Sequence, residues 1–271
     1  MQKFLDVAIE AAQEAGRILL AEFQRPQRIE YKGEVDLVTE ADRRSEQVIV
    51  ERLRQHFPEH AIVGEEGGGQ SAESRYRWYV DPLDGTTNFA HGYPCFCISV
   101  ALAEHTEPIV GVVFDPLHGE LFSAVRGEGA YLNNKRIHVS RVPRLDRSLL
   151  ATGFPSHKRT QNPNIHYYWE FTLRSHGVRR DGAAALDLAA VACGRFDGFW
   201  EFGLKPWDTA AGVLLVREAG GRVTDFTGKP YCVTEPAANF PENALLASNG
   251  LIHGEMQQVA SEVAARASTR L

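Results

Sequence analysis

The chain has 271 residues, of which 44% are hydrophobic, so it can bury a substantial core as one large domain or two small ones. Its formal net charge is −6 and its pI is about 5.9, which argues against a nucleic acid or an anionic membrane as the main partner. The longest apolar stretch, residues 95–103, is far shorter than the roughly 20 residues of a membrane-spanning helix.

The first predicted element is an amphipathic helix over residues 2–24, where apolar side chains recur at helical spacing until Pro26. Acidic residues interrupt its apolar positions, which argues against a signal peptide. A short polar link at residues 32–34 leads to residues 35–39, and a second helix is predicted over 41–56. Five β-rich stretches follow, punctuated by glycines as in a meander. They cover residues 76–81, 96–103, 109–114, 120–125 and 129–132.

The pattern changes after residues 142–144, where strands begin to alternate with helices. Strands are predicted at 148–152, 197–202 and 222–226, and helices at 164–175, 183–193, 208–218 and 250–267. This mixture indicates a layered α/β fold whose first half is more antiparallel. We find no repeat, low-complexity tract or flexible linker. We therefore predict one domain over residues 1–271, with an N-terminal part at about 1–143 and a C-terminal part at about 144–271.

Several residue types that often mark a site give no signal here. The four cysteines form no CxxC motif and no His/Cys cluster, so we interpret them as small buried hydrophobes in a reducing cytoplasm. The ten histidines form no convincing pair at helical spacing. The aromatic residues Tyr167, Tyr168 and Trp169 are interpreted as core or dimer-interface side chains.

Residues 78–89 (WYVDPLDGTTNF) carry the strongest chemical signal. An apolar strand runs into Asp81 and Asp84, and Gly85 then turns the chain into the expected start of a helix. The acids offer hard oxygen ligands for Mg²⁺ or a similar cation, and the free N–H groups of the first helical turn offer an anion seat. Residues 115–119 (DPLHG) repeat the frame with histidine in place of the second Asp, and are interpreted as a plain turn. The first copy, followed by two threonines, points to phosphate-ester chemistry.

Other acidic residues accompany this pair. Glu65 follows a short apolar run, and Asp208 begins an apolar helix that it can cap. If these two converge with the pair, bound cations must offset the repulsion, which is about 4 kcal/mol for two like charges about 4 Å apart at an effective dielectric of 20. Asp42 lies at the start of the second helix. For Asp36 and Glu66 a helix cap or a solvated turn is as good an interpretation as a functional role.

A covalent aspartyl-phosphate is the competing mechanism. Phosphatases of that type carry a nucleophilic Asp and a second Asp two residues later, followed by Thr. Here the spacing is three, and Pro82 makes the gap rigid. The spacing favours both acids as metal ligands, with an activated water as the nucleophile.

With these residues assembled, the chain closely resembles the inositol monophosphatase family, within the lithium-sensitive, Mg²⁺-dependent sugar-phosphatase group. The segments that carry the resemblance are residues 35–42 (VDLVTEAD), 64–66 (GEE), 81–89 (DPLDGTTNF), 207–212 (WDTAAG) and 218–221 (EAGG). The match runs nearly end to end, and separated motifs in the right order are far more specific than any one of them. The resemblance implies the layered αβαβα sandwich of sugar phosphatases and a homodimer.

The resemblance also implies a site for two to three Mg²⁺ ions. Glu65, Asp81 and the backbone carbonyl of Leu83 match the ligands of the first ion. Asp81, Asp84 and Asp208 match the ligands of the second, so Asp81 bridges the pair. A third, weaker ion is similar to one that the family holds near Glu65 through waters.

Catalytic roles follow from the same resemblance. Glu65 and Thr86 are placed like the residues that position and activate the attacking water, with Asp42 hydrogen-bonded behind Thr86. The amides of Gly85 and Thr86 match the phosphate site. Water near Asp208 is placed to protonate the leaving group. Phosphoryl transfer consists mostly of such positioning and of charge neutralisation.

Substrate selection is assigned to the second half of the chain. Ala184 lies in residues 180–185 (RDGAAA), which match a family segment whose backbone faces the sugar ring. Glu201 lies where the family binds ring hydroxyls. Asp181 replaces the small or apolar residue expected there, and it either caps the following helix or alters hydroxyl recognition. Residues 32–34 resemble the loop that closes over the site.

The sequence therefore predicts a cytoplasmic, Mg²⁺-dependent phosphomonoesterase that hydrolyses myo-inositol monophosphate. Its partner is a small phosphorylated polyol or sugar, with no nucleic acid and no membrane. Fructose-1,6-bisphosphatase, histidinol-phosphatase and 3′(2′),5′-bisphosphate nucleotidase share every metal ligand, and residues 87–89 (TNF) favour the inositol branch. The alternative from another class is a family member kept as a binding or regulatory protein. Loss of a ligand would support that alternative, and none is lost here.

Overall fold

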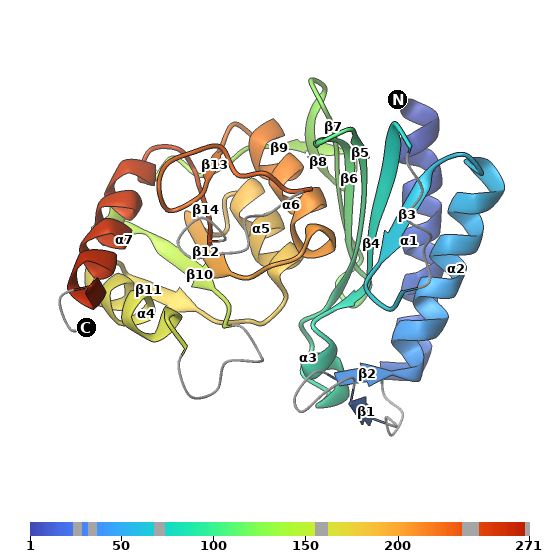
Figure 1. The fold of residues 1–271 in the computed structure, drawn as a ribbon, viewed down its shortest axis with the longest axis horizontal. Coiled ribbons are helices and arrows are strands. Elements are labelled where there is room, and N and C mark those ends of the chain that lie inside the picture. Colours follow the sequence, from blue (N-terminus) through green and yellow to red (C-terminus); the bar gives the residue numbers. More distant parts are fainter. Residues whose placement is uncertain (24–28, 32–36, 68–73, 155–161, 235–243, 269–271) are drawn as a thin grey trace.

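The computed structural model describes residues 1–23, 29–31, 37–67, 74–154, 162–234 and 244–268. Five layers follow one another in Figure 1: two helices, a seven-stranded sheet, two further helices, a five-stranded sheet and an outer pair of helices. This order confirms the predicted layered αβαβα sandwich. The link predicted at residues 32–34, together with Val35 and Asp36, lies outside the described residues.

The first layer consists of α1 (Gln2–Phe23) and α2 (Glu40–His56), which cover one face of the larger sheet. The face of α1 that packs inward is a stripe of small and branched side chains, namely Val7, Ala8, Ala11, Ala12, Ala15 and Leu19. Arg52 of α2 binds Glu10 and Glu14 of α1, which fixes the two helices side by side.

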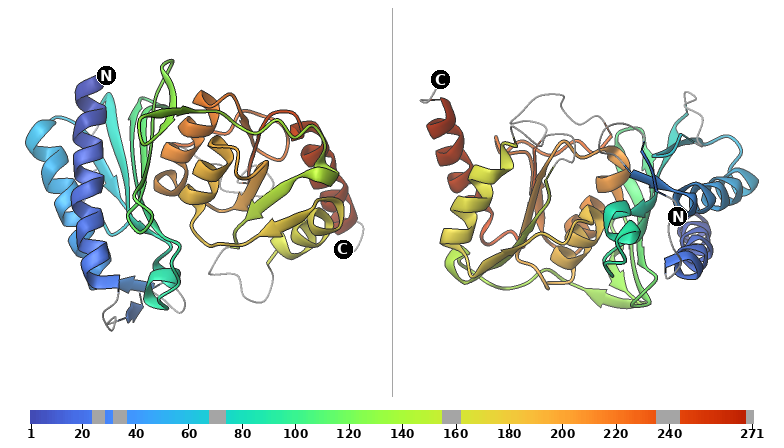
Figure 2. Two further views of the ribbon diagram at one scale, coloured as in Figure 1. Left: turned by 180° about the vertical axis from the view of Figure 1, so that it is seen from behind. Right: turned by 90° about the horizontal axis from the view of Figure 1, so that it is seen from below.

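The larger sheet is a meander in which neighbouring strands follow the order of the chain. Its strands are β3 (Ala61–Gly64), β4 (Tyr76–Asp84), β5 (Cys97–Glu104), β6 (Glu107–Asp115), β7 (Glu120–Val125), β8 (Gly129–Leu132) and β9 (Lys135–Ile137). β3 runs parallel to β4, and every other pair is antiparallel, as predicted for the first half. The short helix α3 (Thr86–Ala90) meets the ribbon of β1 (Ile29–Tyr31) and β2 (Leu37–Thr39) at one end of this sheet (Figure 2).

The smaller sheet has the order β11-β10-β12-β14-β13. These strands are β10 (Leu149–Thr152), β11 (Gly177–Arg179), β12 (Gly198–Phe202), β13 (Arg222–Thr224) and β14 (Ala244–Ser248). β10 runs parallel to β11 and β12, while β14 is antiparallel to both its neighbours. Its outer face is covered by α4 (Asn164–Arg174) and α7 (His253–Ser268), and the one-turn helix η1 (Leu145–Arg147) precedes β10.

The central layer is formed by α5 (Ala184–Ala192) and α6 (Pro206–Glu218), which lie between the two sheets. α6 is apolar almost all round, because both neighbours press closely against it. A Cβ on Gly212 would lie 2.5 Å from Cβ of Leu188 in α5, and a Cβ on Gly111 of β6 would lie 3.0 Å from Cα of Ala211. This close approach brings the first turns of α5 and α6 to the carboxyl end of β4.

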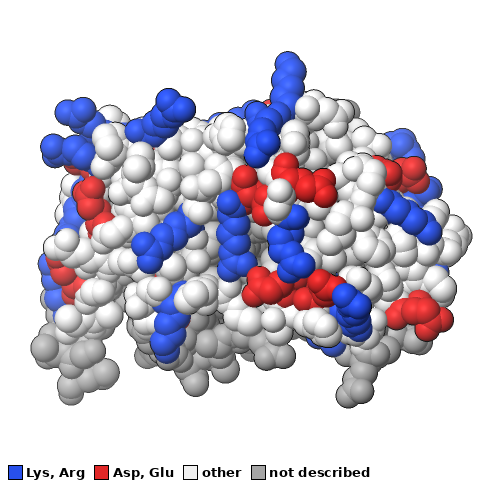
Figure 3. All heavy atoms as spheres, turned by 90° about the horizontal axis from the view of Figure 1, so that it is seen from above, with Lys and Arg blue, Asp and Glu red and all other residues white. Residues whose placement is uncertain are grey.

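Two observations concern the helices and one face of the surface. No helix within them is long and apolar enough to cross a membrane. On the face in Figure 3, basic and acidic side chains lie next to one another at its centre.

All six predicted helices are confirmed, with ends within three residues of their predicted positions. The strands β1, β2, β9, β11 and β14 were not predicted, because segments of three to five residues show too little alternation. β13 is shorter than predicted, since the carboxylate of Asp225 accepts the N–H groups of Thr227 and Lys229 and turns the chain. Residues 115–119 form the predicted turn, between β6 and β7.

Candidate active site

The carboxyl end of β4 is irregular, and the irregularity positions two of the predicted ligands. Its pairing with β5 shifts register between Asp81 and Asp84, where Pro82 has no N–H to give to the ladder. Asp81 is 2% exposed, and its Oδ1 accepts the N–H of Leu83 at 3.0 Å. Ser45 of α2 donates to the carbonyl of Pro82 at 2.8 Å. The bulge is therefore held by a hydrogen bond within it, to Asp81, and by a second one from α2, to the carbonyl of Pro82.

Gly85 ends the bulge and begins α3. Its φ is +97°, and a Cβ there would lie 2.8 Å from a backbone carbonyl, so only glycine fits without strain. The next residue, Thr86, places its Oγ1 3.0 Å from both Oδ1 of Asp42 and the carbonyl of Leu83. The structure thus brings Thr86 and Asp42 together, although 44 residues separate them.

Asp42 is held by a capping box at the start of α2. Its Oδ2 accepts the backbone N–H of Thr39 at 2.8 Å and the hydroxyl of Thr39 at 2.5 Å, while its own N–H donates to that hydroxyl. Burial raises the pKa of Asp42, and the hydrogen bonds from Thr39 and Thr86 oppose this rise. Both carboxylate oxygens are therefore engaged, one by the helix cap and one by Thr86.

Asp84 joins the two halves of the chain. Its Oδ2 accepts the N–H of Ala185 in α5 at 2.7 Å and lies 3.7 Å from Sγ of Cys97. The N-cap residue of α5, Ala183, makes no side-chain cap, so Asp84 supplies the acceptor. The interpretation of Asp181 as the cap of this helix is therefore wrong. Burial raises the pKa of Asp84 to about 7, which the hydrogen bond from Ala185 opposes.

Asp208 is positioned by the first turn of α6, which begins at Pro206, two residues earlier than predicted. Asp208 therefore occupies the third helical position, and its Oδ2 accepts the N–H of the N-cap residue Lys205 at 2.7 Å. Ser99 of β5 donates to the carbonyl of Trp207 at 3.0 Å, which ties this turn to the larger sheet. Burial is the main cause that raises the pKa of Asp208 to about 7.

Glu65 lies just after β3, beside the end of β4. Its N–H donates to the carbonyl of Val80 at 3.1 Å, which extends the parallel pairing by one residue. The buried Glu46 of α2 accepts the N–H of Glu66 at 2.9 Å. A Cβ on Gly64 would lie 2.0 Å from Oε1 of Glu46, so a glycine is needed for this approach.

The four predicted acidic ligands act on one another electrostatically. Burial raises the pKa of Asp81 well above its usual range, and the charges of Glu65, Asp84 and Asp208 raise it further. Like charges raise the pKa of a carboxyl group in this way when they lie near it. Glu65, Asp84 and Asp208 therefore lie within electrostatic reach of Asp81.

This donor set fits a hard divalent cation, because carboxylate and carbonyl oxygens are the ligands that Mg²⁺ prefers, and a cation removes the repulsion among them. Within the described ranges, no three His, Cys, Asp or Glu side chains form a group that could hold a metal ion as they stand, so the fit rests on the chemistry of the donors.

Glu201 of β12 faces the same space from the opposite side. It is buried, and Gly153 makes room for it, since a Cβ at that position would lie 2.1 Å from its carboxylate oxygens. Burial raises the pKa of Glu201 to about 8, with smaller contributions from Asp208 and Asp84, while Arg180 opposes the rise. Glu201 thus lies within electrostatic reach of Asp208 and Asp84.

The segment before α5 is held by Asn88 of α3. The Nδ2 group of Asn88 donates to the carbonyls of Cys95 and Asp181, each at 2.7 Å. Ala184 follows as the first residue of α5. Asn88 therefore connects the helix that carries Thr86 to the segment assigned to the sugar ring.

Sequence reasoning missed Ser45, Glu46, Ser99 and Cys97, which hold the site rather than take part in its predicted chemistry. Ser45 and Glu46 are buried on α2 in the same face as Ile49. Polar residues at apolar helical spacing are the signal that could have identified this pair. No local pattern distinguishes Ser99 or Cys97.

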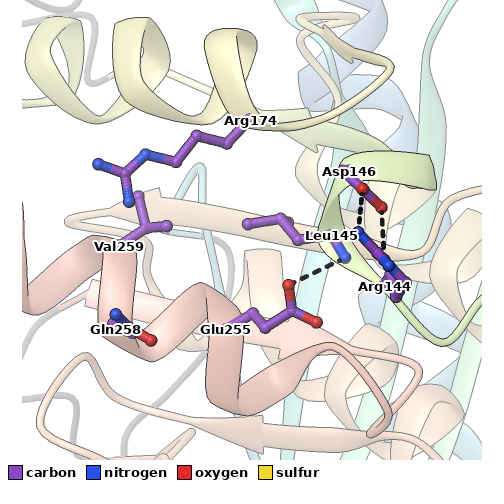
Figure 4. Close-up of a pocket in the computed structure, with 7 residues that line it drawn as sticks. All are labelled: Arg144, Leu145, Asp146, Arg174, Glu255, Gln258 and Val259. Carbon is purple, nitrogen blue, oxygen red and sulfur yellow. Dashed lines mark hydrogen bonds and ion pairs between the residues drawn. The ribbon is translucent and has the colours of Figure 1, made fainter.

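A separate pocket of about 200 Å³ lies between η1, α4 and α7 (Figure 4). Its lining residues are Arg144, Leu145, Asp146, Arg174, Glu255, Gln258 and Val259. The charged groups are already engaged. Arg144 pairs with Asp146, Arg174 pairs with Glu170 and Glu262, and Glu255 accepts the N–H of Leu145. This arrangement gives the pocket no reactive group.

Comparison with known proteins gives consistent matches. The model of the inositol monophosphatase family matches residues 1–269. An inositol-1-monophosphatase of Synechocystis sp. is 45% identical over 262 residues, covering 95% of this chain and 88% of its own. The Nus factor SuhB of Pseudomonas aeruginosa is 48% identical over 237 residues, covering 84% and 87%. Among solved structures, the inositol monophosphatase from Anabaena (Nostoc) sp. matches with a TM-score of 0.85, at 44% identity and 96% coverage of both chains.

Proposed function

The chain belongs to the inositol monophosphatase family and is thus a phosphoric monoester hydrolase, and we propose that it hydrolyses myo-inositol monophosphate with Mg²⁺ as cofactor. The observation that supports this proposal is the electrostatic influence of Glu65, Asp84 and Asp208 on the buried Asp81, together with the Thr86–Asp42 pair. The family acts on small phosphorylated substrates. We place the protein in the cytoplasm, where its four free cysteines stay reduced.

We assign Glu65, Asp81, Asp84 and Asp208, with the carbonyl of Leu83, as the residues that would hold two to three Mg²⁺ ions. When bound, such ions neutralise phosphate charge and lower the pKa of water. The burial and mutual repulsion of the acids support the assignment, since this is the electrostatic state that a cation relieves. By family resemblance, the amides of Gly85 and Thr86 receive the phosphate.

Thr86 and Asp42 act as a positioning pair in this proposal. The hydroxyl proton of Thr86 is directed to Asp42 or to the carbonyl of Leu83, so its oxygen keeps lone pairs free. Those lone pairs can accept a hydrogen bond from the attacking water and orient it. Glu65 is assigned to take the proton of that water, and Asp208 to orient the water that protonates the leaving alkoxide.

Selectivity is assigned to the face opposite the metals. The amide of Ala184, in the first turn of α5, and the carboxylate of Glu201 would receive ring hydroxyls of the substrate. A raised pKa lets Glu201 act as donor or acceptor near neutral pH, which suits a polyol. Fructose-1,6-bisphosphate, histidinol phosphate and 3′-phosphoadenosine 5′-phosphate are the competing substrates on the same scaffold.

Phosphate release at fixed Mg²⁺ from these three compounds and myo-inositol 1-phosphate tests the proposal. We expect preference for the inositol ester and almost complete loss of turnover in Asp84→Asn. Asp146→Asn, which changes an exposed acid on η1, is the matched control and should retain activity. Another preferred substrate would refute the inositol assignment, and near-normal turnover in Asp84→Asn would refute the metal assignment.

We also propose a homodimer, which the family resemblance implies. An exposed apolar stripe on α4, formed by Ile165, Trp169 and Leu173 at four-residue spacing, supplies a surface for a second copy. The alternative is that this stripe is a docking surface for another protein. Relatives named Nus factor SuhB are the reason to test this alternative. Trp169→Ser should convert a dimer to a monomer in analytical ultracentrifugation. An unchanged mass would remove the stripe from the self-interface.

A further inference from the structure

A second pocket, of about 410 Å³, lies between α5 and the turn that connects β6 to β7. Its lining residues are Cys95, Asp115, His118, Glu120, Phe122, Asp181, Leu186, Asp187, Ala190, Arg195 and Phe196. None of them belongs to the residues assigned above to metal or catalysis, and Asp181 is the one that lies in the segment assigned to the sugar ring, residues 180–185. What the pocket binds is therefore a question separate from the metal chemistry of the proposed function.

Two of its four acids already have side-chain partners. Oδ1 of Asp115 accepts two backbone N–H groups, and its Oδ2 lies 2.7 Å from Nδ1 of His118. Glu120 receives both terminal nitrogens of Arg195 in a bidentate pair. These groups form a rim whose hydrogen-bonding capacity is largely used.

The other two acids, Asp187 and Asp181, have no such partner. Asp187 is 2% exposed, and its Oδ2 has no hydrogen-bond partner among the described residues. The side chain of Asp181 likewise makes no hydrogen bond or ion pair within the described part of the chain, although its carbonyl accepts from Asn88. A buried carboxylate without a partner is costly, so native structures rarely keep one without a reason.

The electrostatic surroundings do not remove this cost. Burial raises the pKa of Asp187 well above its usual range, and Asp181, Glu201 and Asp84 raise it further. Arg180 is the cationic group that opposes them. The Oδ2 atom of Asp187 is still left without a hydrogen-bond donor among the described residues.

The shape and lining of the pocket indicate which kind of ligand could supply a positive charge and a hydrogen-bond donor to Asp187. Its volume lies in the range of pockets for small organic ligands. Phe122, Leu186 and Phe196 give it apolar walls. Such walls suit an organic group better than a bare metal ion. An ammonium group also carries its hydrogen-bond donors with it.

We propose that this pocket binds a small organic cation, whose ammonium group donates to Asp187 and Asp181 and whose hydrocarbon part lies against Phe122, Leu186 and Phe196. Arg195 does not compete for the two acids, because Glu120 engages its guanidinium. Charge-assisted hydrogen bonds of this kind are the strong ones in a desolvated site. A neutral molecule of the same shape would contact the apolar walls but would leave both carboxylates without a cation.

Ligand-observed NMR titration of the full chain with butylammonium, and with 1-butanol as the neutral isostere, tests the proposal. We expect butylammonium to bind with a Kd on the order of millimolar, as befits five heavy atoms. 1-Butanol should bind at least roughly tenfold more weakly, since it lacks the charge. Equal binding of both probes, or no saturable binding of either, would overturn the proposal. So would displacement of butylammonium by an equal concentration of Mg²⁺, which would indicate a metal site.

Variants locate the binding. Asp187→Asn should weaken butylammonium binding by roughly tenfold or more, because it removes the charge with little change in shape. Asp6→Asn, an exposed acid on α1, is the matched control and should bind like the unmodified chain. Asp181→Asn, at a half-buried position, should weaken binding severalfold and decides the matter if Asp187→Asn does not fold. Unchanged affinity in a folded Asp187→Asn protein would refute the site.

Discussion

Replacing Asp84 by Asn should stabilise the metal-free protein while it abolishes turnover. Burial raises the pKa of Asp84 from 3.8 to about 7. An acid whose pKa is raised on folding holds its proton more tightly in the folded state. Its contribution to stability is therefore largest below about pH 4 and is lost as the pH rises to about 7. Asn does not titrate, so the variant escapes this loss.

The size of the effect follows from the shift. About three pKa units correspond to about 4 kcal/mol. Asp84 is only partly buried by accessible surface, and neighbouring acids share the titration, so we expect roughly half of this, about 2 kcal/mol. The amide oxygen of Asn can still accept the N–H of Ala185, which preserves the contact with α5. Below about pH 4 the two proteins should be nearly equal in stability.

Urea denaturation with a chelator, at about pH 5 and about pH 8, measures this difference in the free energy of unfolding. Added Mg²⁺ should stabilise the unmodified protein and leave Asp84→Asn nearly unchanged, because ligand binding stabilises by RT ln(1 + [L]/Kd). Asp146→Asn should behave like the unmodified chain in every arm. The reasoning is refuted if Asp84→Asn is the less stable protein at about pH 8 with chelator, or if the difference is the same at both pH values.

Three further substitutions test single contacts of the site. Asp42→Asn should lower kcat by roughly a hundredfold and stability by about 1 kcal/mol, since it disturbs Thr86 and the cap of α2; full activity in steady-state assays would contradict the positioning role. Gly153→Ala should raise KM for the inositol ester severalfold with little change in kcat, because its Cβ displaces Glu201. A fall in kcat without a rise in KM would contradict the assignment of Glu201 to substrate binding. Asn88→Ala should cost about 2 kcal/mol in urea denaturation, through two lost hydrogen bonds, and a loss below about 0.5 kcal/mol would show that solvent replaces them.

The elements that sequence reasoning placed correctly are those with local signals. The helical periodicity of residues 2–24 and the turn at residues 115–119 need no distant partner, and both are found as predicted. The bulge of β4 also has a local cause, since Pro82 removes a ladder hydrogen bond. The strand β14 was missed because its five residues are buried on both faces and show no alternation.

The contacts that the sequence could not reveal join residues far apart in the chain. Asp84 binds Ala185 across 101 positions, and Asn88 reaches Asp181 across 93. A helix whose N-cap residue is the apolar Ala183 indicates that some other acceptor is needed, but not which one. For the same reason Asp181, the nearest acid in sequence, was a reasonable and wrong interpretation. The unpartnered state of Asp187 likewise depends on what surrounds it in space.

The same residues hold the two halves of the molecule together and line the candidate site. Asp84 and Asn88 both connect the end of β4 to the start of α5, and Ser99 connects β5 to α6. The N–H of Ala185 lowers the pKa of Asp84 while burial raises it, so the first turn of α5 helps to keep this acid available as an anion. A substitution that shifts the start of α5 should therefore weaken metal affinity without touching a ligand. Substitutions among the acidic ligands must accordingly be interpreted from stability and turnover measured together, because either can change through this one helix.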